Sequence, residues 1–240
     1  MQLRLYVVHN SHPCAAVEKA LELKGLPYRV WEWPPPLHVP MQKLLFGRRT
    51  VPAIRIDSEK ISGSRTIMRR LDEIAPEPRL YPSDPAQRAR VEEAERWGDE
   101  EFQQVARDLI WAGAVHRPDA LVGYGQGSRL KTPPAVVRLI GPVIARLGRA
   151  VNQTGDEKGR RRLQELPAQI ALIEAWIADG TIGDPDHPNA ADLQILSTVN
   201  LIATMADPRP ALEGSQALAA ARRLFPPIHG ELPAGAIAAL

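Results

Sequence analysis

The chain has 240 residues, of which 44% are apolar and 24% charged, as expected for one large or two modest globular domains with buried cores. Thirty basic and 28 acidic residues leave a net charge of +2, too even to predict a nucleic-acid or membrane partner. One cysteine, Cys14, excludes an internal disulfide, and no signal peptide or membrane span is recognisable, so we expect a cytoplasmic protein.

The first 80 residues alternate between strand and helix patterns. Alternating apolar residues predict a strand over Leu3–Val8, and helical spacing follows over Cys14–Lys24 until Gly25 ends the helix. A second strand is predicted over Tyr28–Trp33. A strand, a helix and a strand in this order form a βαβ unit, which makes a right-handed parallel crossover.

The rest of this half predicts a hairpin and a closing helix. A run of prolines stops the second strand, and residues 37–49 predict an irregular loop or a short helix. Two short strands, Ala53–Ile56 and Lys60–Ser62, fit a hairpin. Ser64 then begins a helix that ends before Pro76. This order of elements is that of the thioredoxin fold.

Residues 75–85 contain four prolines and no periodic pattern, which predicts a linker. Helical patterns then follow at 86–114, 134–152, 160–179, 190–206 and 214–225. We therefore predict an α/β domain over 1–78 and an all-helical domain over 86–240.

Within the helical half, Pro142 and Pro167 interrupt two helical patterns and are expected to kink or split those helices. The glycine-rich stretch 123–127 follows no strand, so it predicts a flexible loop rather than a phosphate-binding turn.

Val51 and Pro52 begin a strand in the first half. A proline at the start of a buried strand marks an edge, a bulge or a cis bond. In the thioredoxin fold this proline is cis and directs the backbone of the preceding residue toward the active site. We therefore predict a cis Val51–Pro52 bond that faces a peptide-like thiol, and the alternative is a plain edge proline.

Ser11 and Cys14 lie where the first strand passes into the first helix. A helix N-terminus stabilises a thiolate placed before it, and a hydroxyl donor there lowers the pKa of the thiol further. This pattern makes Ser11 a candidate activator of a bound thiol, although it could be a simple cap. Cys14 is either a small packed residue or a nucleophile that forms mixed disulfides.

The stretch from Gly63 to Ile67 begins the last helix of the first half. A serine hydroxyl and unpaired N–H groups at a helix N-terminus make a receptor for a carboxylate, so Ser64 is a candidate binding residue. His9, His12 and Cys14 are metal-ligand types close in sequence, but a strand-to-helix turn points them in different directions, and we expect no metal.

These motifs together resemble the cytosolic glutathione transferases, of the serine or cysteine type. The resemblance rests on SHPCAAVEKALELKGLPY, TVPAIRI, ISGSRTI and LYPSDPAQRAR, in that order and spacing, and ISGS and TVP also resemble glutaredoxin-like relatives. In the helical half, PNAADLQI at 188–195 resembles the buried capping box of the family, with Asn189 as the cap and Asp192 reaching back.

The resemblance implies a role for each motif. Ser11 would be the catalytic residue, Val51 and cis-Pro52 would hold the cysteinyl backbone of glutathione, and Ser64, between Gly63 and Arg65, would bind the γ-glutamyl carboxylate. Most relatives have Glu, Asp or Gln at the position of Gly63, so the thiol could be one other than glutathione. The partner of the glycine carboxylate stays open among His38, Lys43, Arg48 and Arg49.

The second substrate should lie in the cleft between the two domains, where ligand sites often form. Candidate lining residues are His9, Arg107 and Trp111, with Phe102 and Tyr124 as further possibilities.

The resemblance thus predicts a homodimeric glutathione transferase that activates the thiol of bound glutathione for attack on a small electrophile. The alternatives are a non-catalytic binding module and a glutathione-dependent thiol–disulfide oxidoreductase that uses Cys14.

Overall fold

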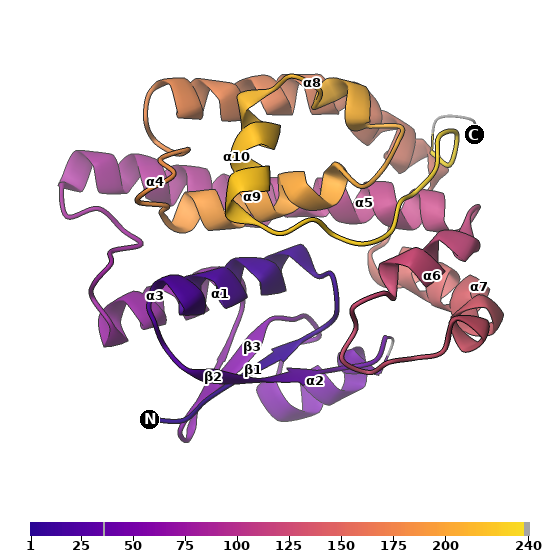
Figure 1. The fold of residues 1–240 in the computed structure, drawn as a ribbon, viewed down its shortest axis with the longest axis horizontal. Helices are drawn as coiled ribbons and strands as arrows, with labels where there is room; N and C mark the ends of the chain where they lie inside the picture. The colour runs from indigo at the N-terminus through magenta and orange to yellow at the C-terminus, as the bar shows by residue number, and fades with distance from the viewer. Residues whose placement is uncertain (36, 238–240) are drawn as a thin grey trace.

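The structure is a computed structural model that describes residues 1–35 and 37–237. Near the N-terminus, the strands β1 (Leu3–Val7), β2 (Tyr28–Glu32), β3 (Ala53–Ile56) and β4 (Glu59–Ser62) form one sheet in the order β2-β1-β3-β4 (Figure 1). The β1–β2 pair is parallel, whereas β3 runs antiparallel to both β1 and β4.

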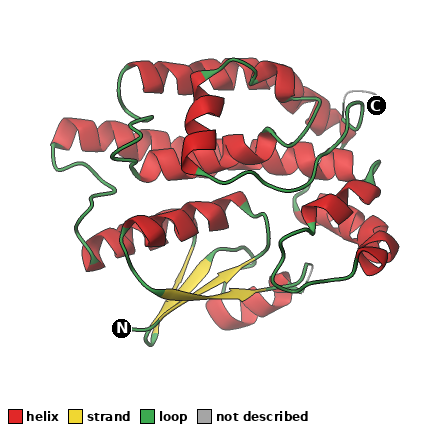
Figure 2. Cartoon of the chain, viewed as in Figure 1, coloured by secondary structure: helices red, strands yellow, loops and turns green. Residues whose placement is uncertain are grey.

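Three helices cover this sheet. α1 (His12–Leu23) and α3 (Ser64–Ile74) lie side by side on one face, and α2 (His38–Phe46) lies on the other (Figure 2). Alternation explains the layering, because Leu3 and Leu5 of β1 are buried under α1 while Arg4 points to the opposite, exposed face. The thioredoxin-like fold predicted for this half is confirmed, and residues 37–49 contain the short helix α2.

The rest of the chain is helical. Its α-helices are α4 (Pro85–Trp97), α5 (Gln103–Ala114), α6 (Leu121–Tyr124), α7 (Pro134–Val151), α8 (Asp156–Ala178), α9 (Ala190–Ile202) and α10 (Gln216–Leu224). Short helical turns η1 (Gly98–Phe102), η2 (Pro118–Ala120) and η3 (Arg209–Ala211) connect some of them. The predicted sequence of a thioredoxin-like half followed by a helical half is therefore confirmed.

Helix α9 holds the two halves together. All of its residues are buried, and it packs against α1 on one side and against α4, α5 and α10 on the others. Its N-terminus is closed by the predicted capping box, in which Asn189 Oδ1 accepts from the N–H of Asp192 and Asp192 Oδ2 accepts from the N–H of Asn189. The hydrophobic core therefore runs continuously from the sheet into the helical half.

Two expectations for the helices need correction in detail. The single helix expected over 86–114 is interrupted by the π-helical turn η1, which the 3.6-residue pattern does not reveal. Pro142 and Pro167 were expected to kink or split their helices; the helices are not split, since α7 and α8 each continue through the proline. In α8, the burial of Leu166 and Ile170 on either side of Pro167 offsets the lost backbone hydrogen bond.

The segment 115–133, predicted to be a flexible loop, contains the helical turn η2 and the short helix α6, and α6 includes the first two residues of the glycine-rich stretch. That prediction was wrong in this part. The segment is anchored to the thioredoxin-like half. His9 Nε2 lies 2.7 Å from the carbonyl oxygen of Gln126, and the Asn10 amide donates to the carbonyl of Tyr124 at 2.7 Å. Further along, the N–H of Arg129 donates to Glu32 at 3.0 Å. The glycine-rich stretch therefore lies against the β1–α1 turn. Among the described residues, no helix is long and apolar enough to cross a membrane.

Candidate functional site

One end of the sheet collects the motifs singled out from the sequence. The register pairs Tyr6 of β1 with Ala53 of β3, and Ala53 with Ser62 of β4. Three segments therefore meet at the same end of the sheet: the turn that follows β1, the residues that precede β3 and the turn that follows β4. The N–H of Gly63 donates to the carbonyl of Pro52 at 3.0 Å, which joins two of these segments directly.

The Val51–Pro52 peptide bond is cis, as predicted. Pro52 is buried, whereas Val51 is half-buried at the start of β3. A second cis bond, Glu77–Pro78, lies in the linker and was not foreseen.

Ser11 is the N-cap residue of α1, but its side chain does not cap the helix. Its hydroxyl instead hydrogen-bonds the Cys14 thiol, and its own carbonyl accepts from the N–H of Cys14 at 2.9 Å. The N-terminus of α1 therefore has no side-chain cap, and a half-buried hydroxyl stands in front of it. This is the arrangement that stabilises an anion at a helix N-terminus.

Cys14 is 2% exposed. Burial raises the pKa of its thiol to about 12, against the smaller opposing effect of the Ser11 hydrogen bond. A thiol that is buried and protonated at neutral pH is a poor nucleophile. The geometry thus favours the packed role of Cys14 over the redox role.

Gly63 and Ser64 form the start of α3. Gly63 has φ +92°, a conformation that favours glycine, and as the N-cap it has no side chain that could accept from the N–H groups of the helix. Ser64 is 2% exposed, and no side chain caps α3. The first turn of α3 therefore offers N–H groups and one hydroxyl to a carboxylate.

Asp99 lies beside Ser64, and its role was not anticipated from the sequence. Its Oδ1 is 3.5 Å from Ser64 Oγ, 3.3 Å from Gln103 Nε2 and 3.0 Å from Gln194 Nε2. The side chain is half-buried. Asp99 belongs to the π-helical turn η1, a feature that often marks functional positions, and the helical pattern over 86–114 contains no signal that could have indicated it.

A polar chain continues from Asp99 toward α1. Gln103 Oε1 accepts from Arg107 Nη2 at 2.6 Å, and the backbone of Gln103 hydrogen-bonds His12. Burial lowers the pKa of His12 well below its usual value, and the Arg107 charge lowers it further. His12 is therefore neutral at pH 7, and Arg107 supplies the positive charge behind the N-terminus of α1.

Arg65 is engaged in ion pairs on the other side of α3. Its Nε lies 3.5 Å from Glu95 Oε2, and its Nη1 lies 3.3 Å from Glu100 Oε1. The structure thus ties the side chain of Arg65 to the helical half rather than leaving it open toward Ser64.

Helix α2 and the segment before it contain buried polar atoms that have no hydrogen-bond partner among the described residues. They are His38 Nδ1, Trp33 Nε1 and both amide atoms of Gln42, which is fully buried. Buried polar groups normally have partners, so these atoms mark a place where a ligand or water is expected. Of the four candidates for the glycine carboxylate, His38 belongs to this group, whereas Lys43, Arg48 and Arg49 are exposed.

The residues predicted for the second-substrate cleft do not come together. The Trp111 ring packs against Gly148 of α7, and Phe102 is buried and stacks on Trp97 at 4.9 Å. The Tyr124 hydroxyl bonds Thr204 Oγ1 at 2.8 Å. His9 contacts the carbonyl oxygen of Gln126, whereas the Arg107 charge acts on His12 and Cys14 in the first turn of α1.

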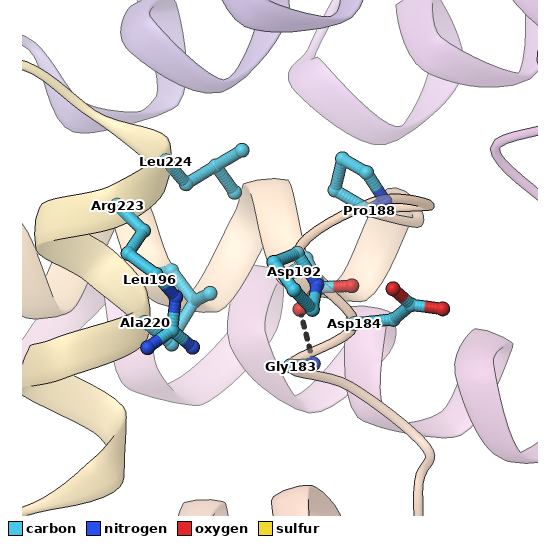
Figure 3. A pocket seen from close by; sticks show the side chains of 9 residues that line it. Gly183, Asp184, Pro188, Asp192, Leu196, Ala220, Arg223 and Leu224 are labelled. Carbon is cyan, nitrogen blue, oxygen red and sulfur yellow. Dashed lines mark hydrogen bonds between the residues drawn. The ribbon is translucent and has the colours of Figure 1, made fainter.

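Two hollows elsewhere contain none of these residues. One lies beside the capping box and is lined by Asp184, Asp192 and Arg223, with Asp192 bonded to the N–H of Gly183 at 2.6 Å (Figure 3). The other lies at the opposite end of the sheet and includes Arg4 and Arg29. In the part of the chain that the structure describes, no group of three or more His, Cys, Asp or Glu side chains could hold a metal ion.

The family comparison agrees with this geometry. Residues 5–79 match the model of the glutathione S-transferase N-terminal domain. Residues 5–79 are therefore similar to glutathione S-transferase N-terminal domains. The match ends at the linker, so it covers the sheet, the β1–α1 turn, cis-Pro52 and the start of α3. No curated protein matches the chain.

Solved structures of glutathione transferases and of a β-etherase share the fold over most of the chain. A glutathione S-transferase from Rhodospirillum rubrum F11 is 20% identical, covers 98% of both chains and has a TM-score of 0.61. The β-etherase LigF from Sphingobium sp. strain SYK-6 is 20% identical over 85% of this chain and 84% of its own, with a TM-score of 0.61. The glutathione-bound theta class enzyme from Xanthomonas axonopodis pv. citri is 19% identical over 82% and 81%, with a TM-score of 0.57. These likenesses show the glutathione-transferase fold.

Proposed function

We propose that the chain is a glutathione transferase, in which residues 1–78 bind glutathione and residues 86–240 hold a small electrophilic substrate. The thiol of glutathione would lie before the N-terminus of α1, where Ser11 donates a hydrogen bond to the sulfur and lowers its pKa. The thiol proton passes to solvent, and the thiolate attacks an electrophilic carbon. The S–C bond forms as the bond between that carbon and its leaving group breaks, and the leaving group departs with the electron pair; Ser11 makes no covalent bond.

The observation that carries this proposal is the uncapped N-terminus of α1. A serine at an N-cap normally accepts from the helix backbone, yet the Ser11 side chain makes no such bond. Ser11 lies at the same end of the sheet as Val51, cis-Pro52 and Ser64. Arg107 adds a positive charge behind the same turn, which favours the thiolate form of a bound thiol.

Ser64 and Asp99 together suit the γ-glutamyl end of glutathione, which carries one carboxylate and one ammonium group. The first turn of α3 and the Ser64 hydroxyl would bind the carboxylate, and Asp99, 3.5 Å from Ser64 Oγ, would bind the ammonium group. Asp99 thereby supplies the negative charge that Gly63 lacks. Val51 would pair with the cysteinyl backbone, and His38 and Gln42 would meet the glycine end.

Two alternatives have less support. The oxidoreductase would need Cys14 as a thiolate, whereas burial raises the pKa of that thiol to about 12. The non-catalytic module would explain the absent carboxylate at Gly63, but Asp99 stands close enough to replace it.

The test is calorimetric titration with glutathione and with cysteinylglycine, which lacks the γ-glutamyl group. We expect glutathione to bind and cysteinylglycine to bind at least tenfold more weakly, and Asp99→Asn to weaken glutathione about tenfold. Glu93→Gln, on an exposed position of α4, is the matched control. No binding of glutathione at millimolar concentration would exclude the proposal, and equal binding of the two ligands would exclude the role of Asp99.

We also propose that the chain forms a homodimer, as the family resemblance implies. Helix α7 carries a stripe of exposed apolar side chains that a second copy could cover: Val136, Leu139, Ile140, Val143, Leu147 and Val151. Light scattering should then give twice the chain mass of 26.4 kDa. A monomer that persists at high protein concentration would contradict this assembly.

A further inference from the structure

The end of the sheet away from Ser11 carries a row of positive charges. The register sets Arg4 of β1 opposite Arg29 of β2 and Arg55 of β3, and Arg55 opposite Lys60 of β4. Residues paired across strands point to the same face, so the four side chains cross the sheet in one line, about 15 Å long. All four residues are exposed.

Like charges directly opposite each other destabilise a sheet. Within the described residues, the side chains of Arg4, Arg29 and Lys60 have no hydrogen-bonding or ion-pair partner, and Arg55 donates only to the backbone carbonyl of Asp57. Of the nearby carboxylates, Glu59 pairs with Arg70. Asp57 borders the same hollow and accepts from the N–H of Gln2, but among the described residues it forms no ion pair with the row. The row therefore keeps a net positive charge, with three arginines and one lysine against one carboxylate.

The row lines a hollow rather than a flat surface. Arg4, Arg29 and Arg55 border it together with Tyr28 and the N-terminal residues. Helix α2 covers the same face of the sheet only further along, where Phe46 packs on Tyr6 at 4.9 Å, and so leaves the row open (Figure 1).

An exposed aromatic ring stands next to the row. Trp31 pairs with Tyr6 in the register, two residues along β2 from Arg29 and on the same face, and it is 50% exposed. Its neighbour Trp33 meets it edge-on at 5.9 Å, which leaves part of the Trp31 ring in solvent. A line of guanidinium groups beside an open aromatic ring is the combination that binds phosphates and stacks a base.

We propose that this face of the sheet binds a nucleoside phosphate, with the phosphates on Arg4, Arg29 and Arg55 and the base stacked on Trp31. The even charge of the whole chain gave no reason to expect such a ligand, since the charges converge only through the strand register. The ligand could be a free nucleotide or a single-stranded nucleic acid, which share this chemistry.

The experiment titrates the full-length protein with ATP, inorganic tripolyphosphate and a fluorescent oligothymidylate, and it compares four variants. Arg4→Gln and Arg29→Gln should each weaken ATP and oligonucleotide binding about tenfold and reduce the slope of log affinity against log salt by about 1. Trp31→Ala should weaken both nucleotide probes roughly tenfold and leave tripolyphosphate unchanged. Arg222→Gln, an exposed cation on α10, is the matched control and should change nothing.

The melting temperature of the Arg4→Gln variant distinguishes a ligand-binding role of the row from a role in stabilising the fold. Removing one of several opposed like charges should leave the melting temperature of Arg4→Gln unchanged or raised. Glutathione binding should be unaffected, because the row lies at the opposite end of β1 from Ser11. If the oligonucleotide binds tenfold more tightly than ATP, the ligand is a single-stranded nucleic acid. If ATP binds tenfold more tightly than the oligonucleotide, the ligand is a free nucleotide. Either result supports the site. The proposal fails if neither nucleotide probe binds, if Arg222→Gln weakens binding equally, or if Trp31→Ala has no effect.

Discussion

The N-termini of α1 and α9 differ in whether side chains cap the unpaired N–H groups of the first helical turn. At α9, the side chains of Asn189 and Asp192 both bond to backbone N–H groups, and the end of the helix is buried and closed. At α1, the N-cap Ser11 leaves the helix uncapped and turns its hydroxyl to a neighbouring sulfur. A closed terminus stabilises the fold, whereas an open terminus keeps its partial positive charge for a ligand.

The largest expected effect is a loss of unfolding free energy when the capped N-terminus of α9 is disrupted. Asp192→Ala removes the acceptor for the N–H groups of Asn189 and Gly183, both at 2.9 Å or less, in a buried place. Leaving these donors without partners should reduce the free energy of unfolding by roughly 3 kcal/mol, measured by denaturant titration. The exposed Asp186→Ala in the preceding loop is the control. A loss below about 1 kcal/mol would mean that the box contributes little to the fold.

The open terminus of α3 should respond in binding rather than in stability. The Ser64 hydroxyl makes only one long contact, to Asp99 at 3.5 Å, so Ser64→Ala should change the free energy of unfolding by less than about 0.5 kcal/mol. The loss of a hydrogen bond to a carboxylate should weaken glutathione about tenfold by calorimetry. The exposed Ser58→Ala in the β3–β4 turn serves as control. A destabilised Ser64→Ala protein with unchanged affinity would place Ser64 among the structural caps.

The smallest expected effect is a difference in unfolding free energy between substitutions of two N-cap serines, Ser215 and Ser11. Ser215 caps α10 by accepting from the N–H of Leu218 at 3.1 Å, so Ser215→Ala should cost about 1 kcal/mol of unfolding free energy. Ser11→Ala should cost less than about 0.5 kcal/mol, because no cap is lost. If the two substitutions cost the same in thermal or chemical unfolding, the α1 terminus is not open in solution.

Much of this contrast was predictable from the sequence. Local patterns indicated the βαβ unit and the hairpin, because each depends on residues close together in the chain. The thioredoxin-like order of elements then implied the cis bond at Pro52, and the family resemblance implied the capping box at Asn189. Asp99 could not be predicted, since its position depends on how the turn η1 meets α3, thirty-five residues away in sequence. The same limit explains Trp111, because an apolar ring near the expected cleft packs equally well against the glycine of another helix.

The most direct test of an active role for Ser11 is the pKa of the glutathione thiol in the complex, read from the ultraviolet absorbance of the thiolate as the pH is raised. The account predicts a value at least one unit below the ordinary thiol pKa of about 8.5, so the thiolate appears at lower pH than in free glutathione. Ser11→Ala should return the pKa toward that ordinary value, and Cys14→Ala should leave it lowered. An unshifted pKa in the wild-type complex, or a shift that is lost in Cys14→Ala and kept in Ser11→Ala, would contradict the account.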